Sequence, residues 1–198
     1  MLFNSIEYFI FLPIVFVLFW LLNGQKLKYQ NFLLLVASYT FYGWWDWRFL
    51  SLIILSTFVD FFVSKSIYNV NSSINKKRLL LLSLFVNIGI LGFFKYCNFF
   101  IDTWFQLWNL NLDNVSANYL NIILPVGISF YTFQTLSYTI DVYNKKLKPS
   151  NSLLDFAVFV ALFPQLVAGP IERAKNLLPQ ISSRNSFSFH YFKEGVLQ

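Results

Sequence analysis

The sequence has few charged residues and almost none of the side chains that usually hold metals or form disulfides. Charged residues make up 12% of the 198 residues, whereas an average globular domain has about 25%. The lone cysteine, Cys97, excludes an internal disulfide and a cysteine-rich metal site. The chain also lacks a glycine-rich phosphate loop, a paired-histidine metal motif, a Gly-x-Ser-x-Gly turn and any nucleic-acid-binding motif. We therefore expect no metal, no bound cofactor and no nucleic-acid partner.

Apolar residues, in contrast, make up 57% of the chain, more than a short soluble domain can bury. They form continuous runs, unlike the alternating strands of a membrane barrel. Because lipid forces backbone groups to pair within their own segment, such runs predict helices. We predict an all-α, polytopic transmembrane bundle of about six spans, with further amphipathic or interfacial helices, formed by residues 1–198 as one unit. The runs are Ile6–Leu22, Phe32–Trp45, Phe49–Val63, Leu79–Phe94, Leu120–Tyr143 and Leu153–Gly169.

Two features refine this topology. Residues 1–7 carry no positive charge, so we expect the first run to be a retained helix instead of a cleaved signal. The mixed segment Tyr96–Leu112 is expected to be a surface-lying amphipathic helix or a half-span. The first, third and fifth gaps between runs are basic and contain no acid, whereas the others mix both signs. The positive-inside rule then predicts cytoplasmic odd gaps, an outside N-terminus and a multi-pass protein of the bacterial inner membrane.

The apolar run Leu120–Tyr143 contains more polar side chains than a membrane anchor requires. Pro125 and Gly127 should interrupt its helix, because proline removes a backbone donor and glycine permits close approach of another group. A polar stripe follows at spacings of three and four residues, which places its members on one helix face. The stripe consists of Gln134, Ser137, Tyr138 and Asp141. It should face the bundle interior or a wet cavity, although residue chemistry alone favours simple hydrogen bonding between helices.

A second break is expected where two prolines and a glycine fall within one apolar run, at Pro164, Gly169 and Pro170. Non-helical backbone at membrane depth is tolerated inside protein or beside water, so Gln165 and Arg173 could line a cavity there. The alternative is that the helix ends near Pro164 and the chain leaves the membrane. Of the remaining ionisable residues, Asp60 is expected to be interfacial or paired, close to Lys65.

Three segments together carry a family resemblance. LPVGISFYTFQTLSYTIDVY at residues 124–143, FPQLVAGPIER at 163–173 and SYTFYGWW at 38–45 resemble landmarks of the membrane-bound O-acyltransferase family, in its alginate O-acetyltransferase type. The resemblance implies a ring of helices around a thin funnel. It also implies transfer of an acetyl group from a cytoplasmic donor, acetyl-CoA or another acyl donor, to a hydroxyl of an extracytoplasmic polysaccharide. The glycan would be reached directly or through a partner acetyltransferase.

The resemblance also carries expectations for individual residues. Gln134, Ser137, Tyr138, Asp141, Gln165 and Arg173 become candidates to line the funnel or bind substrate. The histidine of the family would lie beyond Gln198, and His190, the only histidine, matches a surface helix. We therefore expect the N-terminal portion of a longer enzyme, without a catalytic residue and inactive alone. A secondary transporter, which would usually show an internal repeat, and a non-catalytic membrane subunit remain alternatives.

Overall fold

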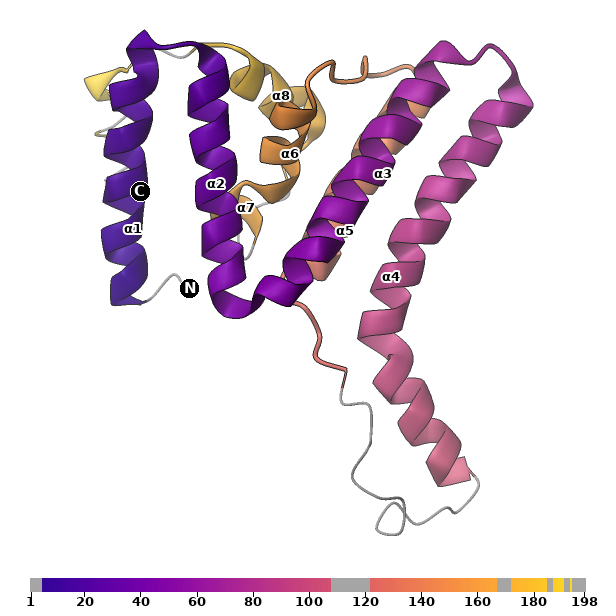
Figure 1. Cartoon of the computed structure of the whole chain (residues 1–198). Helices are drawn as coiled ribbons and strands as arrows, with labels where there is room; N and C mark the ends of the chain where they lie inside the picture. Colours follow the sequence, from indigo (N-terminus) through magenta and orange to yellow (C-terminus); the bar gives the residue numbers. More distant parts are fainter. Residues whose placement is uncertain (1–4, 108–121, 167–171, 185–186, 191–192, 194–198) are drawn as a thin grey trace.

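The computed structural model describes residues 5–107, 122–166, 172–184, 187–190 and 193, except the side chains of residues 102, 105 and 106. Throughout these ranges the regular elements are helices (Figure 1). They are α1 (Ile6–Leu21), η1 (Leu22–Gly24), α2 (Leu27–Asp46), η2 (Trp47–Phe49), α3 (Leu50–Asn69), α4 (Ser73–Leu107), α5 (Ile128–Tyr143), α6 (Leu153–Ala161), α7 (Phe163–Leu166) and α8 (Ala174–Ser182). The all-α prediction is confirmed for this part of the chain.

Three helical stretches are long and apolar enough to cross a membrane: Ile6–Gly24, Leu27–Asn69 and Ser73–Ile101. The second of them consists of α2 and α3, which the η2 turn joins. Large apolar side chains on α1 and α4 are exposed, among them Phe9 and Phe85. Such surfaces are stable against hydrocarbon and costly in water, so the chain is a membrane protein. The count of six spans and the outside N-terminus stay predictions.

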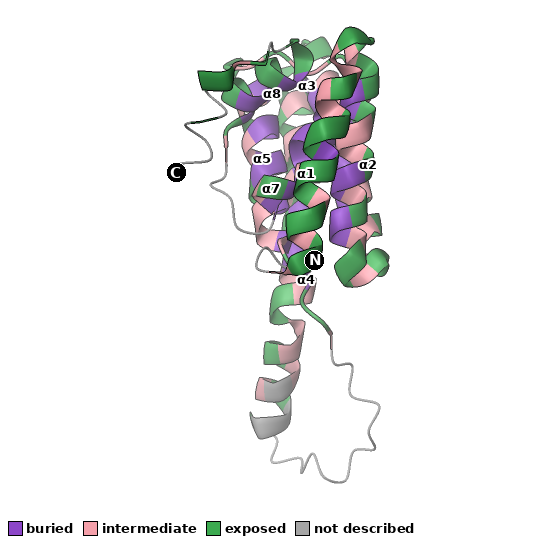
Figure 2. Ribbon diagram, turned by 90° about the vertical axis from the view of Figure 1, so that its left-hand side faces the viewer, coloured by how far each residue is buried: buried purple, intermediate pink, exposed green. Residues whose placement is uncertain are grey.

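Two segments differ from their expected boundaries. The mixed segment that begins at Tyr96 continues the preceding helix, and α4 is one element of 35 residues. No proline interrupts residues 73–107, which removes the main reason for a helix to stop there. Its C-terminal half extends beyond the other helices (Figures 1 and 2). From Ile122, where the description of the run Leu120–Tyr143 begins, the chain becomes helical at Ile128, after the predicted break at Pro125 and Gly127.

The short helix α6 occupies the centre of the bundle. All residues from Phe156 to Ala161 are buried, packed by α2, α3, α5 and α8. Asn31 of α2 donates hydrogen bonds to Asp155 Oδ1 at 2.8 Å and to the Ile181 carbonyl at 3.0 Å, which ties α2 to α6 and α8. In Figure 2, α1 shows mainly exposed and intermediate residues, while buried residues gather on α2 and α5.

The connections between helices alternate between two ends of the bundle. Figure 1 places the α1–α2, α3–α4 and α5–α6 connections at one end and the α2–α3 connection at the other. Two contacts support this grouping: Lys65 Nζ donates to the Asn151 carbonyl at 3.3 Å, and Arg184 donates to the Gln25 carbonyl. The three basic gaps therefore share one end, as a consistent membrane topology requires.

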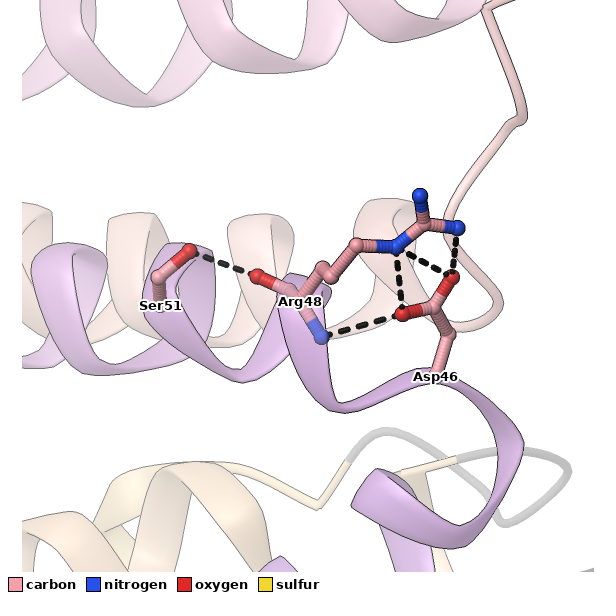
Figure 3. A network of polar contacts seen from close by, with 3 residues as sticks. All are labelled: Asp46, Arg48 and Ser51. Carbon is pink, nitrogen blue, oxygen red and sulfur yellow. Dashed lines mark hydrogen bonds and ion pairs between the residues drawn. The ribbon is translucent and has the colours of Figure 1, made fainter.

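The opposite end carries a local ion pair. At the α2–α3 turn, Asp46 accepts hydrogen bonds from the Arg48 backbone N–H at 3.0 Å and from its guanidinium at 2.6–3.1 Å (Figure 3). Ser51 Oγ donates to the Arg48 carbonyl at 2.7 Å. The carboxylate caps η2, so this turn is fixed by its own residues.

Candidate functional site

The two broken helices predicted from the sequence meet each other. Gly127 precedes α5 with φ +76, in the left-handed region, and a Cβ added there would lie 2.5 Å from the Leu166 carbonyl oxygen. A side chain at this position would collide with α7, so glycine is what permits the contact. The close approach at Gly127 joins the start of α5 to the end of α7. Pro125 lies buried just before this contact.

The second break has a defined geometry. Helix α6 ends at Ala161, Leu162 is extended, and α7 begins at Phe163 with Pro164 in its first turn, where proline is tolerated. The backbone N–H of Phe163 donates to Ser38 Oγ of α2 at 3.2 Å, while Ser38 Oγ donates to the Leu34 carbonyl. Because Phe163 and Leu166 are buried, the chain stays inside the bundle past Pro164. Gly169 and Pro170 lie outside the described residues.

Around the contact of α5 with α7, two buried polar atoms have no hydrogen-bond partner among the described residues. They are Tyr131 Oη, one turn after Gly127, and Gln165 Oε1, next to Leu166. Nearby, Tyr42 of α2 donates to the Val126 carbonyl at 2.9 Å. A buried polar group without a partner costs about 1–3 kcal/mol, so each of these two atoms is a candidate contact for a ligand. We call this group the α5–α7 junction: Tyr42, Val126, Gly127, Tyr131, Gln165 and Leu166.

The predicted polar stripe of α5 lies partly inside the bundle. Gln134 Nε2 donates to the Phe159 carbonyl of α6 at 2.7 Å, and Ser137 Oγ donates to the Gln134 carbonyl at 2.8 Å. Tyr138 Oη accepts from the Ser150 N–H at 2.9 Å and from Ser64 Oγ at 3.3 Å. The bonds of Gln134 and Tyr138 join α5 to other segments, whereas the bond of Ser137 stays within α5. A funnel-lining role for the stripe stays a prediction.

The remaining candidates lie near the end of α5 or beyond α7. Asp141 is partly buried, and its carbonyl accepts hydrogen bonds from the backbone of Lys146 and Leu147. Arg173 is exposed and precedes the first residue of α8. His190 is exposed, beyond α8. The structure therefore places Leu166, the neighbour of Gln165, against Gly127, and it shows no hydrogen bond that joins Asp141 or Arg173 to the α5–α7 junction in the described part.

Two cavities flank α2, and both are largely apolar. One of about 360 Å³ lies between α2, α3 and α6, where Tyr39, Thr57 and Ala157 contribute to its wall. The other, of about 270 Å³, lies between α1, α2 and α7, with Phe163 and Pro164 in its wall. Apolar cavities of this kind suit acyl or lipid chains. No cluster of histidine, cysteine and acids that could hold a metal occurs among the described residues.

Sequence comparisons agree with the resemblance seen in the three segments. The chain is 40% identical over 194 residues to a probable alginate O-acetylase of Pseudomonas putida, which covers 97% of the chain and 39% of that protein. It is 38% identical to the Azotobacter vinelandii probable alginate O-acetylase, over 97% of the chain and 38% of the relative. It is 31% identical to a peptidoglycan O-acetyltransferase of Helicobacter pylori, over 96% of the chain and 40% of the relative.

These similarities define the class: the chain belongs to the membrane-bound O-acyltransferase family. Within the family it is similar to O-acetyltransferases of the alginate and peptidoglycan types, and it spans about two fifths of the length of these relatives. No family model matches the chain. No solved structure matches it either.

Sequence reasoning missed several polar groups that the fold brings together. Tyr131 lies three residues before Gln134, so the three-and-four spacing extends to it although the predicted stripe began at Gln134, and Ser38 lies 125 residues from the Phe163 N–H that it accepts. Both fall within the segments that carry the family resemblance, which was the available signal. Asp60 is expected from the sequence to be interfacial or paired, and in the structure it is fully buried, with its carboxyl hydrogen-bonded by Ser83 and Asn87.

Proposed function

We propose that this chain forms part of the membrane domain of an O-acetyltransferase that modifies an extracytoplasmic polysaccharide. Its similarity to alginate O-acetylases and to a peptidoglycan O-acetyltransferase along nearly the whole chain supports this proposal. Both relatives are named for transfer of an acetyl group to a glycan. The donor is acetyl-CoA or another acyl donor presented at the basic end, and the acceptor is a glycan hydroxyl, reached directly or through a partner acetyltransferase.

The α5–α7 junction is the observation that carries the proposal to particular residues. It is where the two segments of family resemblance meet, and one hydroxyl and one amide oxygen of these segments are buried without a partner among the residues that the structure describes. A tyrosine O–H can donate to an acyl carbonyl oxygen, and a glutamine oxygen can accept from an acceptor hydroxyl. The junction therefore offers one group for each half of an acyl transfer.

The reaction needs little more from these residues than orientation and charge stabilisation. The acceptor oxygen bonds to the acyl carbon, the carbon–sulfur bond of a thioester donor breaks, and the hydroxyl proton passes to a general base while the thiol leaves. Tyr131 Oη donates to the carbonyl oxygen as negative charge develops on it, and Gln165 Oε1 orients the attacking hydroxyl. We assign the base to no residue of this chain.

The test measures acetyl transfer to a glycan in membranes that contain the whole protein with Tyr131 and Gln165. Acetyl-CoA with a labelled acetyl group is supplied with alginate or peptidoglycan, and alkali-labile label on the glycan is counted. We expect Tyr131→Phe, which removes one hydroxyl, to lower transfer by about 10²-fold, the usual cost of losing one such donor. The amount of protein in the membrane should not change.

Tyr29→Phe is the matched control, because Tyr29 is an exposed tyrosine of α2. Equal transfer by the Tyr131→Phe and Tyr29→Phe proteins would remove Tyr131 from the mechanism. If the unaltered protein places no label on either glycan or on a partner acetyltransferase, the proposed function itself is wrong.

A further inference from the structure

Asp60 places a carboxyl group in the interior of the membrane-spanning part of the chain. The residue belongs to α3, within the apolar stretch Leu27–Asn69, and is 0% exposed. Lys65 does not pair with it, because its Nζ donates to the Asn151 carbonyl and lies 4.5 Å from the centre of the Phe61 ring. In the described ranges, the ion pair that forms joins Arg48 to Asp46. Asp60 is therefore a buried acid without a cationic side chain.

The partners of Asp60 come from α4. Ser83 Oγ donates to Asp60 Oδ1 at 2.5 Å, and Asn87 Nδ2 donates to Asp60 Oδ2 at 2.9 Å. The same Asn87 nitrogen donates to the Ser83 carbonyl, which fixes the orientation of the amide. Asn87 Oδ1 then accepts from Ser56 Oγ of α3 at 2.6 Å. Each of these four side chains is at most 1% exposed.

Helix α5 adds two hydroxyls from the third side. Thr135 Oγ1 lies 3.3 Å from Ser56 Oγ. Thr139 Oγ1 is completely buried and lies within hydrogen-bonding reach of the Asp60 carboxyl. We call the group the Asp60 cluster: Ser56, Asp60, Ser83, Asn87, Thr135 and Thr139. It presents side-chain oxygens from three helices to one another.

Two hydroxyl oxygens of the cluster can face each other without a proton between them. Ser56 has one proton, which goes to Asn87 Oδ1, and Thr135 has one, which goes to the Thr132 carbonyl at 3.1 Å. If both protons are used in this way, the two oxygens that lie 3.3 Å apart have no proton between them. The cluster thus gathers one carboxylate with several hydroxyl and amide oxygens, and among the described residues no cationic side chain pairs with the carboxylate.

The energetics point the same way. An ionised carboxylate in a low-dielectric interior is very unfavourable unless it is neutralised. Intramembrane acids accordingly mark ion or proton sites, and hard cations prefer oxygen ligands. We propose that the Asp60 cluster binds one small monovalent cation, Na⁺ or a proton, between α3, α4 and α5.

We next consider which other ionisable groups could give a stability response to Na⁺ or to pH. Tyr138 of α5 lies within electrostatic range of Asp60 and is hydrogen-bonded to Ser64 and Ser150. The charged residues of the surrounding helices form no ion pair with Asp60 in the described structure. They are Lys28 and Asp46 of α2, Arg48 of η2, Lys65 of α3, Lys76, Lys77, Arg78 and Lys95 of α4, Asp141 of α5, and Asp155 of α6. A cation response that depends on Asp60 can therefore be assigned to the cluster.

The test measures thermal unfolding of the purified full chain in detergent, in two series. The first replaces choline chloride or KCl by NaCl at constant ionic strength and pH, and the second varies pH without Na⁺. A cation that binds the folded chain and not the unfolded one stabilises it by mass action. Raising Na⁺ from far below the dissociation constant to ten times that constant should raise the melting temperature by about 3–6 °C. A bound proton should instead stabilise at low pH and lose that effect as pH rises.

Asp60→Asn keeps the shape of the side chain and removes its charge, so it should abolish the response, while Asp46→Asn at the exposed turn should keep it. If Asp60→Asn does not fold, Thr139→Val provides the same test, because loss of one ligand oxygen should weaken Na⁺ binding about tenfold or shift the pH response. A response to Na⁺ identifies sodium, and a response to pH alone identifies the proton. Equal responses of the unaltered chain and the Asp60→Asn or Thr139→Val chain would overturn the proposal.

Discussion

The contact of Gly127 with Leu166 makes a quantitative prediction about stability. Gly127→Ala places a Cβ at φ +76, which costs about 1–2 kcal/mol in the left-handed region. The same Cβ would lie 2.5 Å from the Leu166 carbonyl oxygen, well inside the 3.0 Å that real contacts respect, so α7 must move. Overpacking of this kind costs about 1–3 kcal/mol. Together we expect a loss of about 2–5 kcal/mol in the free energy of unfolding.

A chain of this size loses about 2–4 °C in melting temperature for each kcal/mol, so Gly127→Ala should melt about 4–20 °C lower. Circular dichroism of the purified chain in detergent measures this shift. Gly89→Ala is the matched control, because a Cβ at Gly89 meets no atom within 4 Å and glycine is a poor helix former. That protein should melt at the same temperature or slightly higher. Equal melting of the two variants would show that α7 does not lie against Gly127.

Two further substitutions test the contacts that hold the broken helix and the outer turn. Ser38→Ala should lower the free energy of unfolding by about 1–3 kcal/mol, because the buried Phe163 N–H loses its acceptor. Ser137→Ala is the control and should change stability little, because the Ser137 hydroxyl bonds only within its own helix turn. Similar melting temperatures of the two proteins would contradict a stabilising bond between Phe163 and Ser38. Arg48→Ala should leave the melting temperature unchanged within error, because the Arg48 side chain is 63% exposed and exposed ion pairs contribute little to stability. A decrease in melting temperature as large as that of Gly127→Ala would show that the α2–α3 turn is not solvent-exposed.

The architecture was predictable where one signal dominates. Continuous apolar runs placed α1 to within one residue and α2 and α3 to within about six, and Pro125 with Gly127 indicated the start of α5. The boundary at Tyr96 was wrong because a change in composition was interpreted as a change in structure. A helix ends where its backbone bonds fail, and nothing in residues 73–107 removes a backbone donor.

The candidate site was predictable only by position along the chain. Spacing placed Gln134 and Tyr138 on one face of α5, and both proved to be buried. What each side chain meets depends on residues far away: Gln134 meets Phe159, 25 residues on, and Tyr138 meets Ser64, 74 residues back. Periodicity contains no information on such partners. For the same reason, periodicity could not predict that the Tyr131 hydroxyl has no hydrogen-bond partner among the described residues.

Asp60 shows how unknown hydrogen-bond partners change a functional interpretation. From the sequence, a carboxylate five residues before a lysine belongs at the membrane interface, where both charges reach water. In the fold, α4 supplies Ser83 and Asn87 to the same carboxyl, so the charge can remain in the interior without Lys65. Hydrogen bonds alone do not cancel the charge of a buried carboxylate. Because α3, α4 and α5 all contribute to the cluster, whichever cation cancels that charge also fixes the packing of the helix that begins at the α5–α7 junction.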